Sequence, residues 1–182
     1  MDSRNEILKQ IRDGVIVGVP VDAQVELVAL SLDAIQGPTT TDTPITINYG
    51  AAQPGSVISL AADGVYTFHE TGTFNFNIYL QYGRTGAAGT SHLLFRSMLD
   101  PNTGTYQPAG TTIPQYIANA SDLKVLILTL PVAITVPETK LKQELIRDSS
   151  GNDSGDLVSH TPADPQFGIC PCSQLIIWRN KT

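Results

Sequence analysis

Histidines and cysteines are the side chains of this sequence whose chemistry and spacing deserve the first test. His69, His92 and His160 are the three histidines, and none stands two or four residues from another, as metal ligands on one strand or helix do. His69 and His92 fall on strands that could be neighbours, so a paired site is an alternative to two unconnected side chains. Cys170 and Cys172 are separated by one proline, which would strain a disulfide between them. Two sulfurs alone do not complete a tetrahedral zinc site. We therefore expect two reduced cysteines, with a metal or redox role as the alternative.

A second candidate is an acidic loop rich in glycine and serine. Its oxygen-bearing side chains are Asp148, Asn152, Asp153 and Asp156. Oxygen ligands gathered in one loop are what calcium requires, although the spacing is not that of the twelve-residue loop ending in glutamate. Asn, Asp and Gly are also the residues that tight turns select. We predict a turn, and calcium binding by this loop remains open.

Sequence patterns for catalysis are absent. There is no GxSxG around a serine, no HExxH and no glycine-rich phosphate loop. Glu70, Glu138 and Glu144 could supply the two carboxylates of a glycosidase, but no spacing brings two of them together. We predict that the protein is not an enzyme and that it has no catalytic residue, cofactor or metal.

Composition excludes two classes of partner. The chain has 182 residues, a formal net charge of −6 and scattered single Lys and Arg residues, whereas a nucleic-acid binder needs a basic stripe. No run of 18 apolar residues occurs, so no membrane insertion is expected. The N-terminus lacks the apolar core of a secretory signal, which predicts synthesis in a cytoplasm.

The elements that must position any site are strands. In the segment 73–82, Phe74 and every second residue after it are apolar, while Asn75, Asn77, Tyr79 and Gln81 alternate with them. A period of two over nine residues is typical of a strand with one core face. The amide-rich face suits water or another subunit.

Short strands separated by turn residues continue along the chain. The expected strands are 45–49, 57–61, 65–69, 73–82, 91–99, 123–136, 141–147 and 175–179. Eight strands at this spacing without a helical run predict an all-β domain over residues 45–182, folded as a β-sandwich or jelly roll.

The first 44 residues are expected to lie outside that domain. Residues 1–36 are predicted to form an N-terminal arm with a capped helix from Ser3 to about Gly14. The segment 21–36 can be a helix or a strand, because neither of its alternating faces is polar. Residues 37–44 have a proline near each end and small polar residues between, as a linker does.

The strand 123–136 has no polar face before Pro131. Val125 and Ile127 lie on one side, and Leu126, Leu128 and Leu130 lie on the other. One side of a sandwich strand normally meets water, so an apolar outer side indicates a covered surface. Oligomerisation is the simpler explanation, and burial by the N-terminal arm is the alternative.

These segments resemble a known family. The series Asp63 to Phe68, then Gly72-Thr73-Phe74, the strand 123–136, the hairpin Glu144 to His160 and the closing Gln174 to Asn180 are similar to the jelly rolls of tumour necrosis factor and complement q. The resemblance covers about residues 44–182 and implies a compact homotrimer.

Without a collagen-like stalk or a secretory signal, the chain looks more like the jelly rolls of bacteriophage virion proteins. That resemblance implies a trimeric capsid decoration protein, located on the virion, whose arm at 1–36 binds the major capsid protein or another virion protein. The alternatives are a fibre or tail tip that binds a receptor or host surface glycan, and a jelly-roll enzyme of the cupin or glycan-hydrolase kind. The expected subunit-contact residues are Asn75, Asn77, Tyr79, Gln81, Leu126, Leu128 and Leu130.

Overall fold

The longest strand of the protein, β5 (Gly72–Arg84), organises the first of two sheets. The structure is a computed structural model that describes residues 23–31, 34–86 and 89–180. β5 pairs with β12 (Ser173–Asn180) and β11 (Gly155–Leu157), and with β9 (Lys124–Ile134). β1 (Ala23–Ser31) pairs with β12, so the main order of this sheet, sheet A, is β1-β12-β5-β9.

The second sheet, sheet B, is built around β10 (Thr139–Arg147) and β6 (Ser91–Asp100). On one side of β10 lie β4 (Tyr66–Phe68), then β3 (Ile58–Leu60), and the short β2 (Ile45–Thr46). β6 also pairs with β7 (Gln107–Pro108) and β8 (Ile113–Ile117), which gives the order β3-β4-β10-β6-β8.

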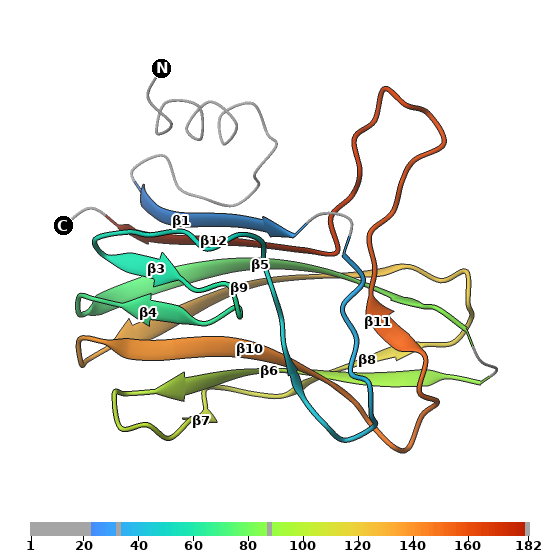
Figure 1. The fold of residues 1–182 in the computed structure, drawn as a ribbon, viewed down its shortest axis with the longest axis horizontal. Helices are drawn as coiled ribbons and strands as arrows, with labels where there is room; N and C mark the ends of the chain where they lie inside the picture. The colour runs from blue at the N-terminus through green and yellow to red at the C-terminus, as the bar shows by residue number, and fades with distance from the viewer. Residues whose placement is uncertain (1–22, 32–33, 87–88, 181–182) are drawn as a thin grey trace.

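The path of the chain between the sheets defines a jelly roll. From β1 the chain enters sheet B through β2, β3 and β4 and returns to sheet A at β5. It then crosses to β6, β7 and β8, returns at β9, crosses again to β10 and comes back to β11 and β12 (Figure 1). Every strand pairing among the described residues is antiparallel. The strand orders β1-β12-β5-β9 and β3-β4-β10-β6-β8 are those of two interlocked Greek keys. The predicted all-β jelly-roll sandwich is confirmed, and all eight expected strands are present, although several are shorter than expected.

Aromatic and aliphatic side chains from both sheets fill the space between them. The expected core face of β5 is confirmed, because Phe74, Phe76, Ile78, Leu80 and Tyr82 are each at most 1% exposed. The rings of this core meet at tilted angles with centroids 5.0 to 6.2 Å apart, an arrangement favoured by aromatic quadrupoles.

β1 corrects the expected domain boundary. It falls within the segment assigned to the arm, yet its backbone pairs with β12 along eight register positions. A β-bulge at Glu26 turns Val25 and Val28 to one side, while Leu27 and Ala29 enter the core. Apolar residues therefore occupy both sides of the strand, which is why its sequence has no polar face. The predicted helix from Ser3 lies outside the described residues.

The predicted linker is hydrogen-bonded to the sandwich just before its start and near its end. Gln36 exchanges two backbone hydrogen bonds with Leu157, at 3.0 and 2.8 Å. Its side-chain amide donates to the carbonyl of Asn48 and accepts from the Asn48 N–H. Further on, the Asp42 N–H donates to the Arg147 carbonyl at 2.7 Å. Residues 37–44 are therefore a connection fixed to β10 and β11 rather than a free tether.

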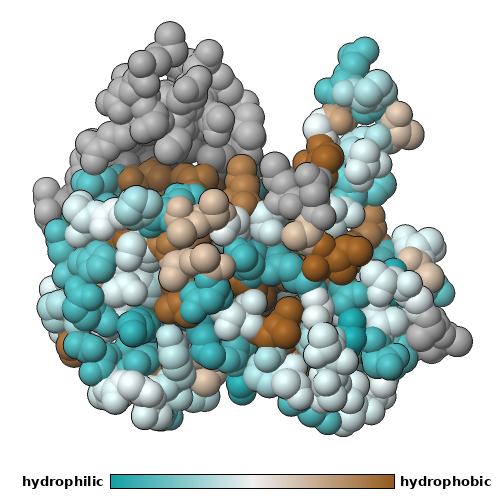
Figure 2. Space-filling view, in the orientation of Figure 1, coloured by the Kyte–Doolittle hydropathy of each residue, from teal (hydrophilic) through white to brown (hydrophobic). Residues whose placement is uncertain are grey.

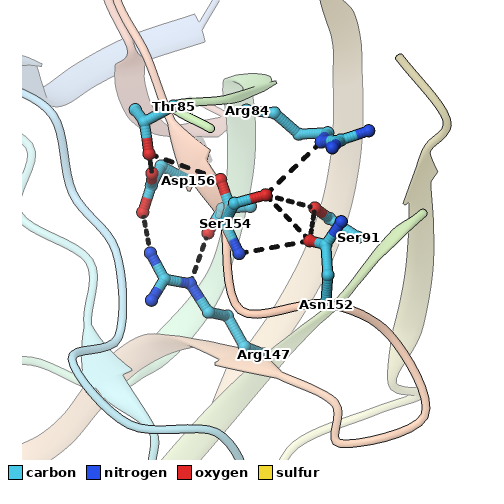
Figure 3. A network of polar contacts seen from close by, with 8 residues as sticks. Arg84, Thr85, Ser91, Arg147, Asn152, Ser154 and Asp156 are labelled. Atoms are coloured by element: carbon cyan, nitrogen blue, oxygen red, sulfur yellow. Dashed lines mark hydrogen bonds and ion pairs between the residues drawn. The ribbon is translucent and has the colours of Figure 1, made fainter. Parts of the chain in front are cut away.

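A buried polar network joins the sheets where β5, β6, β10 and β11 meet (Figure 3). Asp156, 3% exposed, pairs with Arg147 at 2.5 Å and accepts from the Thr85 hydroxyl at 2.7 Å. Asn152 Oδ1 accepts hydrogen bonds from the hydroxyls of Ser91 and Ser154. The turn prediction for the acidic loop fits these contacts. Within the described residues no group of three or more His, Cys, Asp or Glu side chains could hold a metal ion.

Candidate interaction surface

The outer face of sheet A, the side away from sheet B, is the surface that the sequence assigned to subunit contacts. Directly opposite residues of antiparallel strands share a face, so the register defines rows of outward side chains across the sheet. Three rows run from β1 through β12 and β5 to β9: Leu30, Gln174, Tyr79 and Ile127; Val28, Ile176, Asn77 and Thr129; Val25, Trp178, Asn75 and Pro131. Each row has apolar atoms at its margins and an amide or phenol in the middle.

The middle of the face carries neutral polar groups. Asn75, Asn77 and Tyr79 are half-buried on β5. Burial, and secondly the proximity of Cys170, raises the pKa of the Tyr79 phenol above its ordinary value, so the group stays a neutral donor. Its hydroxyl donates to Gln81 Oε1 at 3.1 Å. These side chains can exchange hydrogen bonds with a partner without the desolvation cost of a charge.

Gln81 is not available to a partner. It is 4% exposed, and its Nε2 donates to the Val158 carbonyl at 2.9 Å. The side chain therefore ties β5 to the segment that follows β11. Its place in the predicted contact set is wrong, because the chain itself covers it.

β9 presents the opposite side from the one predicted. Leu126, Leu128 and Leu130 are partly buried and pack against the core, so they do not belong to the outer face. Val125 and Ile127 do, and they are 50% and 65% exposed. The apolar outer stripe inferred for this strand exists, but it consists of the other set of residues.

The β1 margin of the same face is partly covered already. Ile176 and Trp178 point outward yet are 2% and 3% exposed, and they form a second apolar cluster with Val25 and Val28. Beside them Leu30 remains 44% exposed. At the end of β12, Arg179 lies 2.7 Å from Glu26 Oε1 and donates to Glu70 Oε2 at 2.9 Å. The charges thus stand at the end of the face, and its centre is neutral.

A loop projects beside this face, between β11 and β12 (Figure 1). His160 and Cys170 close its base with reciprocal backbone hydrogen bonds of 3.0 and 2.8 Å. Near the tip, Asp164 accepts from the N–H groups of Gln166 and Phe167, and Phe167 is 67% exposed. Figure 2 shows apolar surface gathered near the base of this projection. The sequence-based prediction assigned residues 161–169 to no element, because they lie between the hairpin that ends at His160 and the closing strand, and so it missed this projection.

The residues singled out for their chemistry are dispersed. His69 and His92 lie at different ends of sheet B. His69 contacts Ser59, and His92 contacts Ser150. Cys172 is buried and Cys170 half-buried, and both are free thiols. The paired histidine site is not formed. Within the described residues, no helix is long and apolar enough to cross a membrane.

Comparison with known proteins yields only structural likeness. No protein-family model and no curated protein sequence matches the chain. Among solved structures, Eiger TNF from S. frugiperda is similar over 87% of this chain and 94% of its own, with 10% identity and a TM-score of 0.47. The jelly-roll assignment made above depends on the strand order of this chain.

Proposed function

We propose that the protein is a structural module that forms a homotrimer through the outer face of sheet A. The observation that carries the proposal is this face itself, where Val125, Ile127 and Leu30 are 44–65% exposed around a neutral amide centre. An apolar patch with few charges at its centre is typical of subunit interfaces. The mechanism is adhesion between rigid sheets and requires no chemistry.

We further propose that the trimer decorates a virus particle, as the resemblance to bacteriophage virion proteins suggests. Residues 1–22 would then bind the capsid or another virion protein, and the sandwich that begins at β1 would form the exposed body. A capsid decoration protein needs a stable body and one attachment point, which this division provides. The virion is thus the proposed location, reached from synthesis in a host cytoplasm.

The test of assembly compares two valine substitutions. Val125→Lys places a charge in the exposed stripe of β9, whereas Val136→Lys changes a valine of 39% exposure beyond the end of that strand. Light scattering should give three times the monomer mass for the native chain and Val136→Lys, and monomer for Val125→Lys. A monodisperse native monomer at micromolar concentration would overturn the proposal.

The test of location uses truncation. Removing residues 1–22 leaves β1 intact, so the trimer should persist while binding to purified particles is lost. Removal of residues 1–36 would also delete the partner of β12, and we expect that variant to unfold. Binding of the shorter truncation to particles at the native level would contradict the docking role.

The projecting loop favours a second candidate function, a receptor- or glycan-binding tip. Exposed aromatic side chains on a loop with a fixed base are common in binding sites. Replacing Phe167 by Ser should leave the trimer unchanged and reduce adsorption to host cells if the loop binds a receptor. Unchanged adsorption would leave decoration as the function.

A further inference from the structure

Three side chains on the outer face of sheet B form a chain of hydrogen bonds that the sequence did not suggest. The Ser59 hydroxyl lies 3.0 Å from His69 Nε2. His69 Nδ1 lies 2.8 Å from Glu138 Oε1. A serine, a histidine and a carboxylate are thus joined through the two different nitrogens of one imidazole, which is the connectivity of a nucleophile, a base and an orienting acid. We call these residues the Ser59 cluster.

Backbone pairing holds the members of the cluster in place. Ser59 lies in β3 opposite Thr67, so its side chain points outward while Ile58 and Leu60 enter the core. His69 follows β4, and its N–H donates to the Val57 carbonyl at 2.8 Å. On the other side of β4, the Glu138 N–H donates to the Phe68 carbonyl at 2.7 Å. β4 therefore brings together a serine from one neighbouring strand and a glutamate from the turn before the other.

Glu138 occupies an unusual backbone conformation for its residue type. Its φ is 60°, in the left-handed region that glycine and asparagine fill more readily. The turn is closed by the Thr139 hydroxyl, which donates to the Val136 carbonyl at 2.6 Å. A residue that carries a side chain is strained in this region. Residues held in this region concentrate at functional sites, which is a second observation pointing to the same cluster.

The hydrogen bonds set the direction in which a proton can move. A carboxylate only accepts, so Nδ1 of the neutral imidazole carries the proton and donates it to Glu138. Nε2 is then the acceptor, and the Ser59 hydroxyl donates to it. The side chains of His69 and Glu138 are 32% and 53% exposed, and Ser59 is half-buried, so small molecules can reach the hydroxyl.

We propose that Ser59 is a nucleophile activated by His69, and that it reacts with small activated acyl esters. The hydroxyl oxygen attacks the ester carbonyl as its proton passes to His69 Nε2. The carbon–oxygen bond to the leaving group breaks, the leaving alcohol takes that proton, and Ser59 is left acylated. Water, deprotonated by the same nitrogen, then releases the acid and restores the hydroxyl.

This activity goes beyond the proposed assembly role and departs from the sequence-based expectation of no enzyme. The two surfaces lie on opposite sides of the sandwich, because the assembly face is the outer side of sheet A and the Ser59 cluster is on the outer side of sheet B. Assembly and acyl transfer can therefore fail independently in experiments.

The experiment treats the full chain with a fluorophosphonate probe and follows hydrolysis of p-nitrophenyl acetate. We expect one covalent adduct per chain, located on Ser59 by peptide mass spectrometry and lost in Ser59→Ala. His69→Asn should slow labelling by about 10²-fold, the usual contribution of a general base.

Two further variants separate the proposed chemistry from simple exposure or misfolding. Glu138→Gly keeps the left-handed turn and removes the carboxylate, so we expect a folded protein whose labelling is slower by roughly tenfold or more. Ser150→Ala is the matched control, because Ser150 also contacts a histidine, His92. The Ser150 hydroxyl, however, donates directly to Asp148, so serine, imidazole and carboxylate do not form a chain in that order. Ser150→Ala should label like the native chain.

The outcomes are unambiguous when light scattering is measured on the same samples. Equal labelling of native protein and Ser59→Ala, or no adduct on a trimeric native protein, overturns the proposal and leaves the assembly role intact. Loss of labelling in Ser59→Ala with an unchanged trimer supports it.

Discussion

Replacing Asp156 by alanine should destabilise the sandwich strongly, because it leaves a largely shielded arginine without its counter-charge. Asp156 is 3% exposed and the Arg147 side chain 12% exposed, with 2.5 Å between Oδ1 and Nη2. The Thr85 hydroxyl would lose its acceptor as well. Breaking a buried ion pair from one side costs about 3–5 kcal/mol.

That cost is large relative to the whole stability of a domain. Globular domains unfold with about 5–15 kcal/mol, so the loss would be roughly a fifth or more of the whole stability. For a chain of this length, about 2–4 °C per kcal/mol gives a fall in Tm of roughly 6–20 °C. Trp178 is the single tryptophan and is 3% exposed, so its fluorescence in guanidinium chloride reports unfolding directly.

A control substitution and a double-mutant cycle test whether loss of the Arg147–Asp156 ion pair causes the lower stability. Asp153→Ala changes an exposed carboxylate of the same loop and should alter stability by less than about 0.5 kcal/mol. Arg147→Met combined with Asp156→Ala should be less unstable than the sum of the single changes, with a coupling of about 1–3 kcal/mol. If Asp156→Ala were as stable as Asp153→Ala, the ion pair would not hold these segments together.

Three further predictions test neighbouring features. Gly37→Ala should cost about 1–3 kcal/mol in denaturant unfolding, because its Cβ would stand 1.6 Å from Asp156 Oδ1; native stability would show that the connection is not tightly packed. Leu128→Ala should lower stability at every protein concentration, whereas Ile127→Ala should act only where subunits associate; the reverse would invert the face assignment. Burial alone would raise the pKa of Glu144, but hydrogen bonds from its cationic neighbours outweigh it and lower the pKa. Its stabilisation is therefore present above the pKa of an unfolded glutamate, about 4.3, and is lost as pH falls through the lower folded value. In Glu144→Gln, the free energy of unfolding should therefore fall less steeply with decreasing pH in the acid range than in the native protein.

The sequence identifies the core face of a strand whose apolar and polar residues alternate strictly. It does not identify that face where both sides of a segment are apolar. Phe74 to Tyr82 could be assigned a core face because polar residues mark its other side. β1 could not, because a bulge at Glu26 and two separate apolar clusters remove any polar side. The composition of residues 37–44 predicts a linker. Position 37, however, is a glycine because a Cβ there would collide with the Asp156 side chain.

The Ser59 cluster shows a different limit of sequence analysis. Its three members are separated by 10 and 69 positions in the chain and have no common pattern. In the sequence, Glu138 is one of several carboxylates with no partner at a recognisable spacing. The one local sign was a glutamate after proline in a turn, at a position where glycine is more usual.

The reversed assignment of β9 shows which piece of information was lacking. Alternation separates Val125 and Ile127 from Leu126 and Leu128, but it does not say which set faces inward, because both are apolar. Register decides it: Leu128 lies opposite Ile78, which belongs to the core face of β5, and opposite residues share a face. Pairing by one residue more or less would exchange the two sets completely. An apolar strand beside a clearly alternating one therefore requires its register before its outer face can be named, and here that register makes Ile127 the residue available to a second subunit.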